Sequence, residues 1–318
     1  MSTLRMLAKK RAICENSAMK RRMGVALVLA ADNGDAAKVT ELLSHRTRVN
    51  ARDRGFTPLL AAALQGHADV CELLLDLGNA NIEEVEFYGN TALNTSAREG
   101  HTDTVALLLS KGARVDNVNE NGFTPLLSAS NGGHDDVCRL LLSTGKTNVK
   151  ETIPDGGTPF LLATQFGHIE VCELLMANGS DLEEKYPDTQ FTALHIAAAL
   201  GHESLLQLLL SHKADANIRS SFEATPLHLA SREGYFSSVR ALLQAGADPL
   251  LPQVDGILPI HSAAQRNHSE VVSILIGQGR CSPDQVNHYR HNNHHQCVLA
   301  AKHYGWKYPT DACRSVSS

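Results

Sequence analysis

The chain has 318 residues, of which 43% are apolar and 20% charged, a composition typical of a globular protein with ample material for a core. Its formal net charge is −5, but the first 23 residues carry seven Lys or Arg and one Glu, so the remainder has a net charge of −11. An acidic body disfavours general binding of nucleic acid, and no apolar run approaches the length of a membrane span.

Residues 1–23 are interpreted as a basic N-terminal lead-in that is flexible or weakly helical. Two clusters, Lys9-Lys10-Arg11 and Lys20-Arg21-Arg22, leave open a nuclear-import signal or contact with an anionic surface. The second cluster and the apolar residues 25–31 after it also mimic a signal peptide. However, they start 20 residues into the chain and align with the first helix of a repeat, so we do not favour that reading.

From residue 24 onward one sequence unit recurs. In its clearest copy, residues 224–234, Thr225 is suited to cap a helix, Pro226 to open it and Gly234 to end it in a left-handed conformation. A second apolar run follows, and each unit is therefore predicted to be helix, turn, helix and polar loop. The Thr recurs at intervals of 33 or 34 residues, a period typical of repeat architectures, at Thr57, Thr91, Thr124, Thr158, Thr192 and Thr225.

The Thr-Pro-Leu-His-x-Ala motif, the Gly-His pair and the Leu triplet before Gly-Ala-Asp resemble the ankyrin repeat family. The resemblance covers roughly residues 24–280 and implies an all-α ankyrin-repeat solenoid of stacked helix-turn-helix units with projecting hairpin loops. It does not by itself imply any chemistry. We expect a lead-in over 1–23, eight ankyrin-like repeats over 24–286, an irregular loop and C-terminal cap helix over 287–309, and a tail over 310–318.

The seven cysteines do not form a disulfide framework by their spacing. Cys71, Cys138 and Cys172 occupy one slot of the repeat, which Val fills in other copies, and this exchange predicts a small buried apolar residue. An odd number of cysteines without framework spacing favours a reducing compartment, so we expect a cytoplasmic protein, with the nucleus as the alternative location.

Most of the 16 histidines fall at repeat positions, after the helix-ending Gly or fourth in Thr-Pro-Leu-His. The resemblance implies that they brace loops and helix starts. The exception is the His-rich loop at 288–295, whose spacing matches no zinc pattern, so a plain loop is favoured and metal binding is left open. No nucleophile elbow, phosphate-binding Gly loop or His-Glu-x-x-His motif occurs, and we expect neither enzyme activity nor a cofactor.

Ankyrin arrays resembling this one would bind a partner on the concave face of the first helices and on the hairpin tips. Aromatic residues and Arg make effective anchors in such interfaces. The predicted partner-binding residues are Arg54, Tyr88, Arg98, Phe166, Leu200, Phe222, Arg232 and Arg266. These predictions favour a monomeric, non-catalytic scaffold or adaptor that binds a protein and no small-molecule substrate. The alternative is a substrate-recognition subunit of a ubiquitin ligase or another multi-protein complex.

The sequences of two loops suggest further hypotheses. Glu83 and Glu84 precede Phe87 and Tyr88, and acid beside aromatic would suit a basic, partly extended peptide. The segment 209–217 resembles ankyrin segments modified by asparaginyl hydroxylase, with Asn217 as the acceptor.

Overall fold

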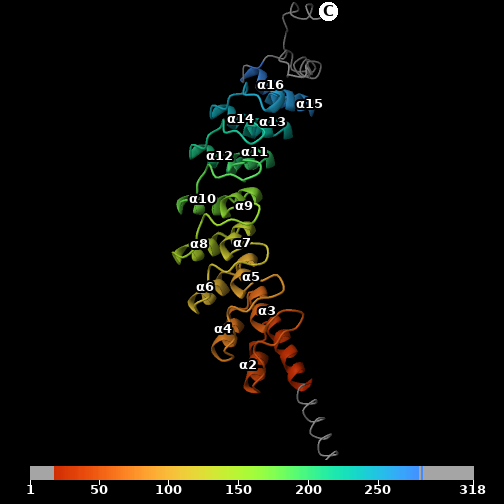
Figure 1. Ribbon diagram of the computed structural model, residues 1–318, viewed down its shortest axis with the longest axis vertical. Coiled ribbons are helices and arrows are strands. Elements are labelled where there is room, and N and C mark those ends of the chain that lie inside the picture. The colour runs from red at the N-terminus through yellow and green to blue at the C-terminus, as the bar shows by residue number, and fades with distance from the viewer. Residues whose placement is uncertain (1–17, 279–280, 282–318) are drawn as a thin grey trace, which may run out of the picture. The chain divides into compact units, whose positions relative to one another are not determined.

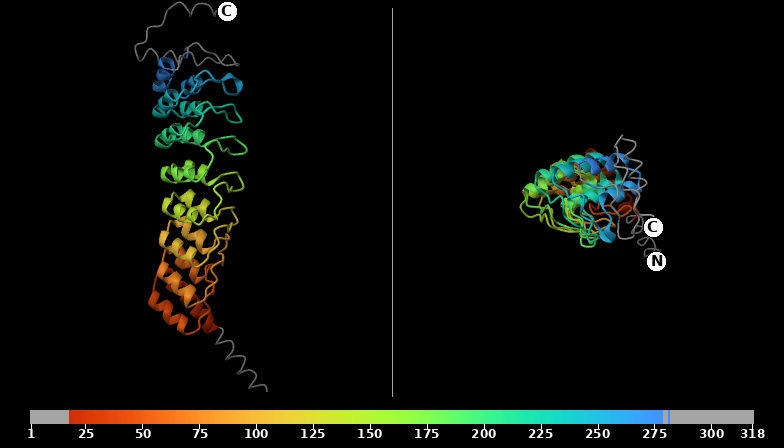
Figure 2. Two further views of the ribbon diagram at one scale, coloured as in Figure 1. Left: turned by 90° about the vertical axis from the view of Figure 1, so that its left-hand side faces the viewer. Right: turned by 90° about the horizontal axis from the view of Figure 1, so that it is seen from above.

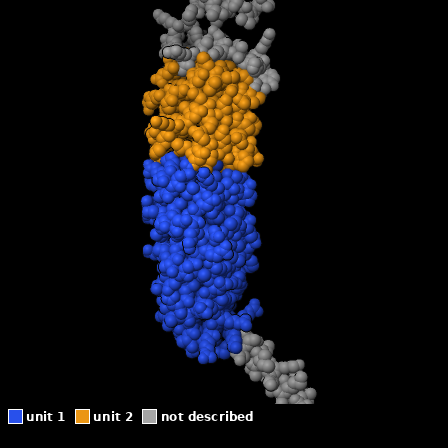
Figure 3. All heavy atoms as spheres, turned by 60° about the vertical axis from the view of Figure 1, so that its left-hand side comes forward, with its two compact units in different colours: residues 1–166, 170–180 blue, residues 167–169, 181–318 orange. Residues whose placement is uncertain are grey.

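The computed structural model describes residues 18–278 and residue 281. These residues form helices joined by loops, with no strand among them beyond an isolated bridge between Asp53 and Phe56. The chain divides into two compact units, Met1–Phe166 with Glu170–Ser180 and Gly167–Ile169 with Asp181–Ser318 (Figure 3). The all-α fold expected from the sequence is confirmed.

The described residues of unit 1 begin with a helical stretch over 18–32, which includes residues 18–23 of the expected lead-in. A single helix, α2, and then four helix pairs follow, labelled in Figure 1. They are α2 (Ala36–Ser44), α3 (Pro58–Gln65), α4 (Ala68–Asp76), α5 (Ala92–Glu99), α6 (Thr102–Ser110), α7 (Pro125–Gly132), α8 (Asp135–Ser143), α9 (Pro159–Phe166) and α10 (Ile169–Ala177), whose first residue is counted with unit 2.

Unit 2 repeats the same arrangement. Its elements are α11 (Ala193–Leu200), α12 (Glu203–Ser211), α13 (Pro226–Glu233), α14 (Phe236–Gln244), the short 3₁₀ helix η1 (Val254–Gly256), α15 (Pro259–Gln265) and α16 (Ser269–Gly277). Within each unit the first helices lie in one row and the second helices in another, and the loops project from one side (Figure 2).

The first helix of each pair begins and ends as its sequence predicts. In α3 the hydroxyl of Thr57 accepts a hydrogen bond from the Leu60 N–H at 3.3 Å, and Pro58 occupies the first helical position. Gly66 ends the helix with φ +77°, a left-handed conformation that favours glycine. In the eighth repeat Asn267 replaces this Gly with φ +62°, which is tolerated because Asn adopts the left-handed region more readily than most residues.

The second helices supply much of the core. The middle Leu of each triplet is fully buried, as at Leu74, Leu108, Leu141, Leu175 and Leu209. Cys71, Cys138 and Cys172 are also fully buried, like Val105 and Val239 in the same slot. The predicted role of this slot as a small apolar core position is therefore confirmed.

Histidines after the helix-ending residue link neighbouring repeats, as the resemblance implied. The Nε2 atom of His101 lies 2.9 Å from the Leu64 carbonyl oxygen, and that of His134 lies 2.8 Å from the Arg98 oxygen. These bonds satisfy carbonyls near the ends of the first helices, which have no partner within their own helix. Each such His therefore positions the end of the preceding first helix.

The His of Thr-Pro-Leu-His is a buried brace. Nδ1 of His195 accepts from the Thr192 N–H at 3.2 Å, and Nε2 lies 3.0 Å from the carbonyl oxygen of Ala224 in the next repeat. His228 makes the same pair of contacts, with Thr225 and Ile257. Burial lowers the pKa of both His195 and His228 to about 4, so both rings are neutral at pH 7.

The proposed boundaries at 23, 286 and 309 remain predictions. The cap helix expected within 287–309, the tail at 310–318 and the His-rich loop at 288–295 lie outside the described residues. No helix among residues 18–278 is long and apolar enough to cross a membrane.

Candidate partner-binding site

Unit 1 contains a hollow of about 260 Å³ where two hairpin loops, residues 86–90 and 119–123, meet α5 and α7. It brings together two of the predicted partner-binding residues, Tyr88 from a loop and Arg98 from the last turn of α5. The ring of Phe123 and the hydroxyl-bearing Ser128 also line it. The remaining lining residues are asparagines, namely Asn90, Asn119, Asn121 and Asn131.

A chain of hydrogen bonds holds the loop side of this hollow. Nδ2 of Asn119 donates to Oδ1 of Asn90 at 2.7 Å, and Asn90 donates through Nδ2 to Oε1 of the buried Glu86 at 2.6 Å. Oδ1 of Asn119 accepts from the N–H groups of Asn121 and Phe123 at 3.0 and 2.9 Å. The two loops are further joined by the Glu120 N–H, which donates to the Tyr88 carbonyl at 2.9 Å. Side-chain networks of this kind order the wall before any partner arrives.

Tyr88 and Arg98 differ in how far they are already engaged. The side chain of Tyr88 is 65% exposed, so a partner can cover its ring. Nε of Arg98 donates to Oε1 of Glu99 at 2.8 Å, and both side chains are exposed. An exposed ion pair contributes little stability, so a partner group can share the guanidinium at small cost.

The acidic side chains of the loop before Tyr88 are bonded to residues of neighbouring repeats. Oε1 of Glu83 accepts from the Arg114 N–H at 2.9 Å, and its other oxygen accepts from Nδ2 of Asn117. Glu84 pairs with Arg52 at 2.6 Å. These carboxylates link neighbouring repeats, so the aromatic residues of the loop are the groups left for a partner.

In unit 2 the carboxylate of Glu233 bridges two of the predicted residues, Arg232 and Arg266. Oε1 of Glu233 accepts from Nε of Arg232 at 2.7 Å, and its Oε2 accepts from Nη1 of Arg266 at 3.1 Å. Leu200, at the end of α11, and Phe222, on a hairpin loop, are 46% and 60% exposed.

The other predicted residues stand apart from the hollow. Arg54 lies at the tip of a hairpin loop with φ +47°, and Phe166 is the exposed last residue of α9. Oδ1 of Asn217 accepts from the Asp248 N–H at 2.7 Å, and its Nδ2 donates to the Gly246 carbonyl at 3.2 Å. In this structure the Asn217 carboxamide therefore links two successive loops, and its hydroxylation remains a prediction.

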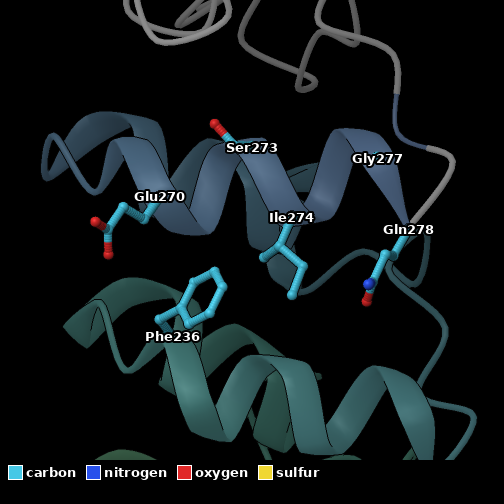
Figure 4. Close-up of a pocket in the computed structure, with 6 residues that line it drawn as sticks. All are labelled: Phe236, Glu270, Ser273, Ile274, Gly277 and Gln278. Carbon is cyan, nitrogen blue, oxygen red and sulfur yellow. The ribbon is translucent and has the colours of Figure 1, made fainter. Parts of the chain in front are cut away.

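A second hollow, of about 470 Å³, lies in unit 2 between α14 and α16. Figure 4 shows the ring of Phe236 and the side chain of Ile274 facing each other across it. Glu270, Ser273, Gly277 and Gln278 complete its lining. It belongs to the second helices, and no predicted site residue lines it. Sequence reasoning missed it, although Phe236 is a large aromatic residue at a position that holds Ala68 and Thr102 elsewhere.

A metal-binding cluster is not found among the residues that the structure describes. Among residues 18–278 and 281, no three His, Cys, Asp or Glu side chains are placed to hold a metal ion. Burial raises the pKa of the Cys71, Cys138 and Cys172 thiols to about 12, so they are poor nucleophiles at pH 7.

Comparisons with known proteins point to relatives that share the repeat. The chain is 39% identical over 97 residues to human "Ankyrin repeat and KH domain-containing protein 1" and 36% identical over 97 residues to "Dauer abnormal formation protein 25" of Caenorhabditis elegans. Each match covers 30% of the chain, but only 4% of the human protein and 25% of the nematode protein. These matches therefore relate the repeats, and not the whole proteins.

A solved structure supports the same relationship at the level of the fold. The human ASB11 ankyrin repeat domain is 23% identical, with a TM-score of 0.61, and the match covers 77% of this chain and 98% of that one. The family model "Ankyrin repeats (3 copies)" matches residues 27–119, 114–186 and 162–253, and the model "Ankyrin repeat" matches residues 255–288. The chain belongs to the ankyrin repeat family.

Proposed function

We propose that the chain is a non-catalytic scaffold or adaptor that binds a partner protein through its hairpin loops and the ends of its first helices. Ankyrin repeats are generally protein-interaction modules. The observation that carries the proposal is the ordered hollow in unit 1, where the exposed ring of Tyr88 and the guanidinium of Arg98 converge. Aromatic residues and Arg dominate the binding energy of many protein interfaces.

Exposed apolar side chains elsewhere on the loops support an extended contact surface. Phe87 is 69% exposed, and in unit 2 Phe222 is 60% and Val254 48% exposed. The Val254 N–H donates to the Phe222 carbonyl at 3.1 Å, so these two tips are neighbours. Removing such side chains from water is the main favourable term in association.

The test is affinity capture from cell lysate with the full chain and a Tyr88→Ala, Arg98→Ala variant. A matched control carries Phe236→Ala and Arg240→Ala, which remove an exposed aromatic residue and an exposed arginine from α14 instead. We expect the first variant to lose a set of partners that the control retains, with circular dichroism unchanged in both. Loss in the control alone, or retention in both, would contradict the proposal.

A second candidate is a substrate-recognition subunit of a ubiquitin ligase. It is favoured by one relative, a rice protein named "Probable E3 ubiquitin-protein ligase XBOS33", which is 39% identical over 90 residues. That match covers 27% of the chain and 17% of the rice protein. The same capture experiment separates the two candidates, since ubiquitin-ligase subunits that co-purify with both variants would favour this one.

The proposal includes a reducing compartment, the cytoplasm or nucleus. Supporting it, the buried Cys71, Cys138 and Cys172 form no disulfide. Fractionation of cells that express the full chain would test this placement.

A further inference from the structure

The hollow at Tyr88 and Arg98 is unusual in its chemistry, because carboxamides are its most frequent polar groups. A carboxamide offers both hydrogen-bond donors and an acceptor. A peptide unit of a partner's main chain offers the same two functions, one N–H and one C=O. Asn121 lies on the loop side of the hollow and Asn131 on α7. Their carboxamides therefore have the donors and acceptors that hydrogen bonds to main-chain groups require.

The loop side of the hollow has little freedom to rearrange. Asn90 and Asn119 are bonded to each other and to Glu86, and Asn119 also accepts the N–H groups of Asn121 and Phe123. Binding to an ordered site avoids much of the entropic cost of fixing its side chains. Weak groups such as neutral amides can therefore contribute to affinity here.

The charges around the hollow argue against a strongly anionic ligand such as a phosphate. Arg98 is the one cation among its lining residues, and its Nε is bonded to Glu99. Glu86 is buried behind Asn90. Phosphate sites usually gather several cations or backbone N–H groups. The hollow therefore suits a neutral polar group.

The size of the hollow selects the conformation of the partner. Its volume of about 260 Å³ is slightly below the range of roughly 300–1,000 Å³ for drug-sized ligands. An α-helix is about 10 Å or more across and uses its main-chain groups internally. An extended segment leaves its N–H and C=O groups available and is narrower than a helix, so it suits a hollow whose lining includes Tyr88 and Phe123.

We propose that this hollow binds an extended peptide segment of the partner by its main chain, with Asn121 and Asn131 bonding a peptide unit and Tyr88 and Phe123 flanking the adjacent side chain. The inference rests on the proposed function and specifies the form of the partner. It requires no particular sequence in that segment, since main-chain groups are common to all residues.

The test uses the full chain and two display libraries, one of short linear peptides and one of folded three-helix domains. Binders are sorted by whether Tyr88→Ala abolishes their binding. For linear peptides that depend on Tyr88, affinity is measured against an Asn121→Leu, Asn131→Leu variant and against Asn178→Leu. The last is a matched control, because Asn178 is an exposed asparagine just after α10.

We expect Tyr88-dependent linear binders whose affinity falls by about tenfold or more in the double variant and changes little in the control. With the unaltered protein, methylating single backbone nitrogens of the peptide should cause a similar loss at one or two adjacent positions. This measurement does not depend on the folding of any variant.

Two results would overturn the inference and leave the proposed function standing. One is a set of linear binders that tolerates N-methylation at every position and is insensitive to the double variant. The other is Tyr88-dependent binders that come only from the helical library, in which case the proposed function stands and the extended form fails. If neither library yields Tyr88-dependent binders, the inference and the proposed function fail together.

Discussion

The two buried braces His195 and His228 make the stability of unit 2 depend on pH. Each ring is neutral in the folded chain, with Nδ1 accepting a backbone N–H, so protonation would break that bond and place a charge in the core. Burial lowers the pKa of both groups from 6.5 to about 4, and Lys185 beside His195 and Arg219 beside His228 act in the same direction. The unfolded chain therefore binds more protons than the folded chain between these values.

The sign and size of the effect follow from proton linkage. The stabilisation is complete above the unfolded pKa and is lost as pH falls towards the folded one, so unfolding becomes easier on acidification. From pH 7 to pH 5 each His should cost about 2 kcal/mol of unfolding free energy, or about 4 kcal/mol for the pair. The carboxyl of Asp116, whose pKa the neighbouring Arg114 lowers below 3.8, titrates outside this window.

The assay is urea unfolding followed by circular dichroism at pH 7 and pH 5. The chain itself suggests the variant, because Asn94 occupies the same slot in the third repeat and its Nδ2 donates to the Phe123 carbonyl at 3.2 Å. His195→Asn with His228→Asn should lower stability at pH 7 but remove most of the loss between pH 7 and pH 5. A double variant that keeps the full pH dependence would refute the reasoning, as would an unaltered chain equally stable at both values.

Three further predictions concern stability and reactivity. Leu141→Ala should destabilise the chain by about 2–5 kcal/mol, because its side chain is fully buried, and more than Leu142→Ala, as measured by chemical denaturation. Gly100→Ala and Gly112→Ala both introduce a Cβ at positive φ, which costs about 1–2 kcal/mol. Only at Gly100 would that Cβ clash with the ring of His134, so the melting temperature of Gly100→Ala should fall further than that of Gly112→Ala, and equal losses would contradict this contact. Cys71, Cys138 and Cys172, whose thiol pKa is raised to about 12, should resist iodoacetamide in the folded chain and react once it is unfolded, as peptide mass spectrometry would show. Rapid labelling of the folded chain at these positions would show that they are not buried.

The repeat units could be predicted because their signals are local. Thr57, Pro58 and Gly66 fix the start and end of α3 through bonds that span a few residues, and each recurs in register along the chain. The burial of Cys71 followed from comparing one slot across repeats. Such periodic signals average over many copies, so a weak preference becomes a firm prediction.

The candidate site could be predicted only in part, because it depends on contacts between repeats. The exposed positions of Tyr88 and Arg98 followed from their place in the unit, but the bond from Asn119 to Asn90 spans 29 residues and gives no local signal. Glu83 and Glu84 read as free acids in the sequence, yet their partners Arg114 and Arg52 lie 31 and 32 residues away. Side-chain pairing at that distance becomes visible only when the repeats are stacked.

The central claim, that the partner binds at the loops and first-helix ends of unit 1, is tested most directly by site-specific photo-crosslinking in cells. A photoreactive phenylalanine would replace Tyr88 in one sample and Phe236, on α14, in another. The account predicts a discrete partner adduct from position 88 that is absent at position 236. An adduct confined to position 236, or none at position 88, would contradict it.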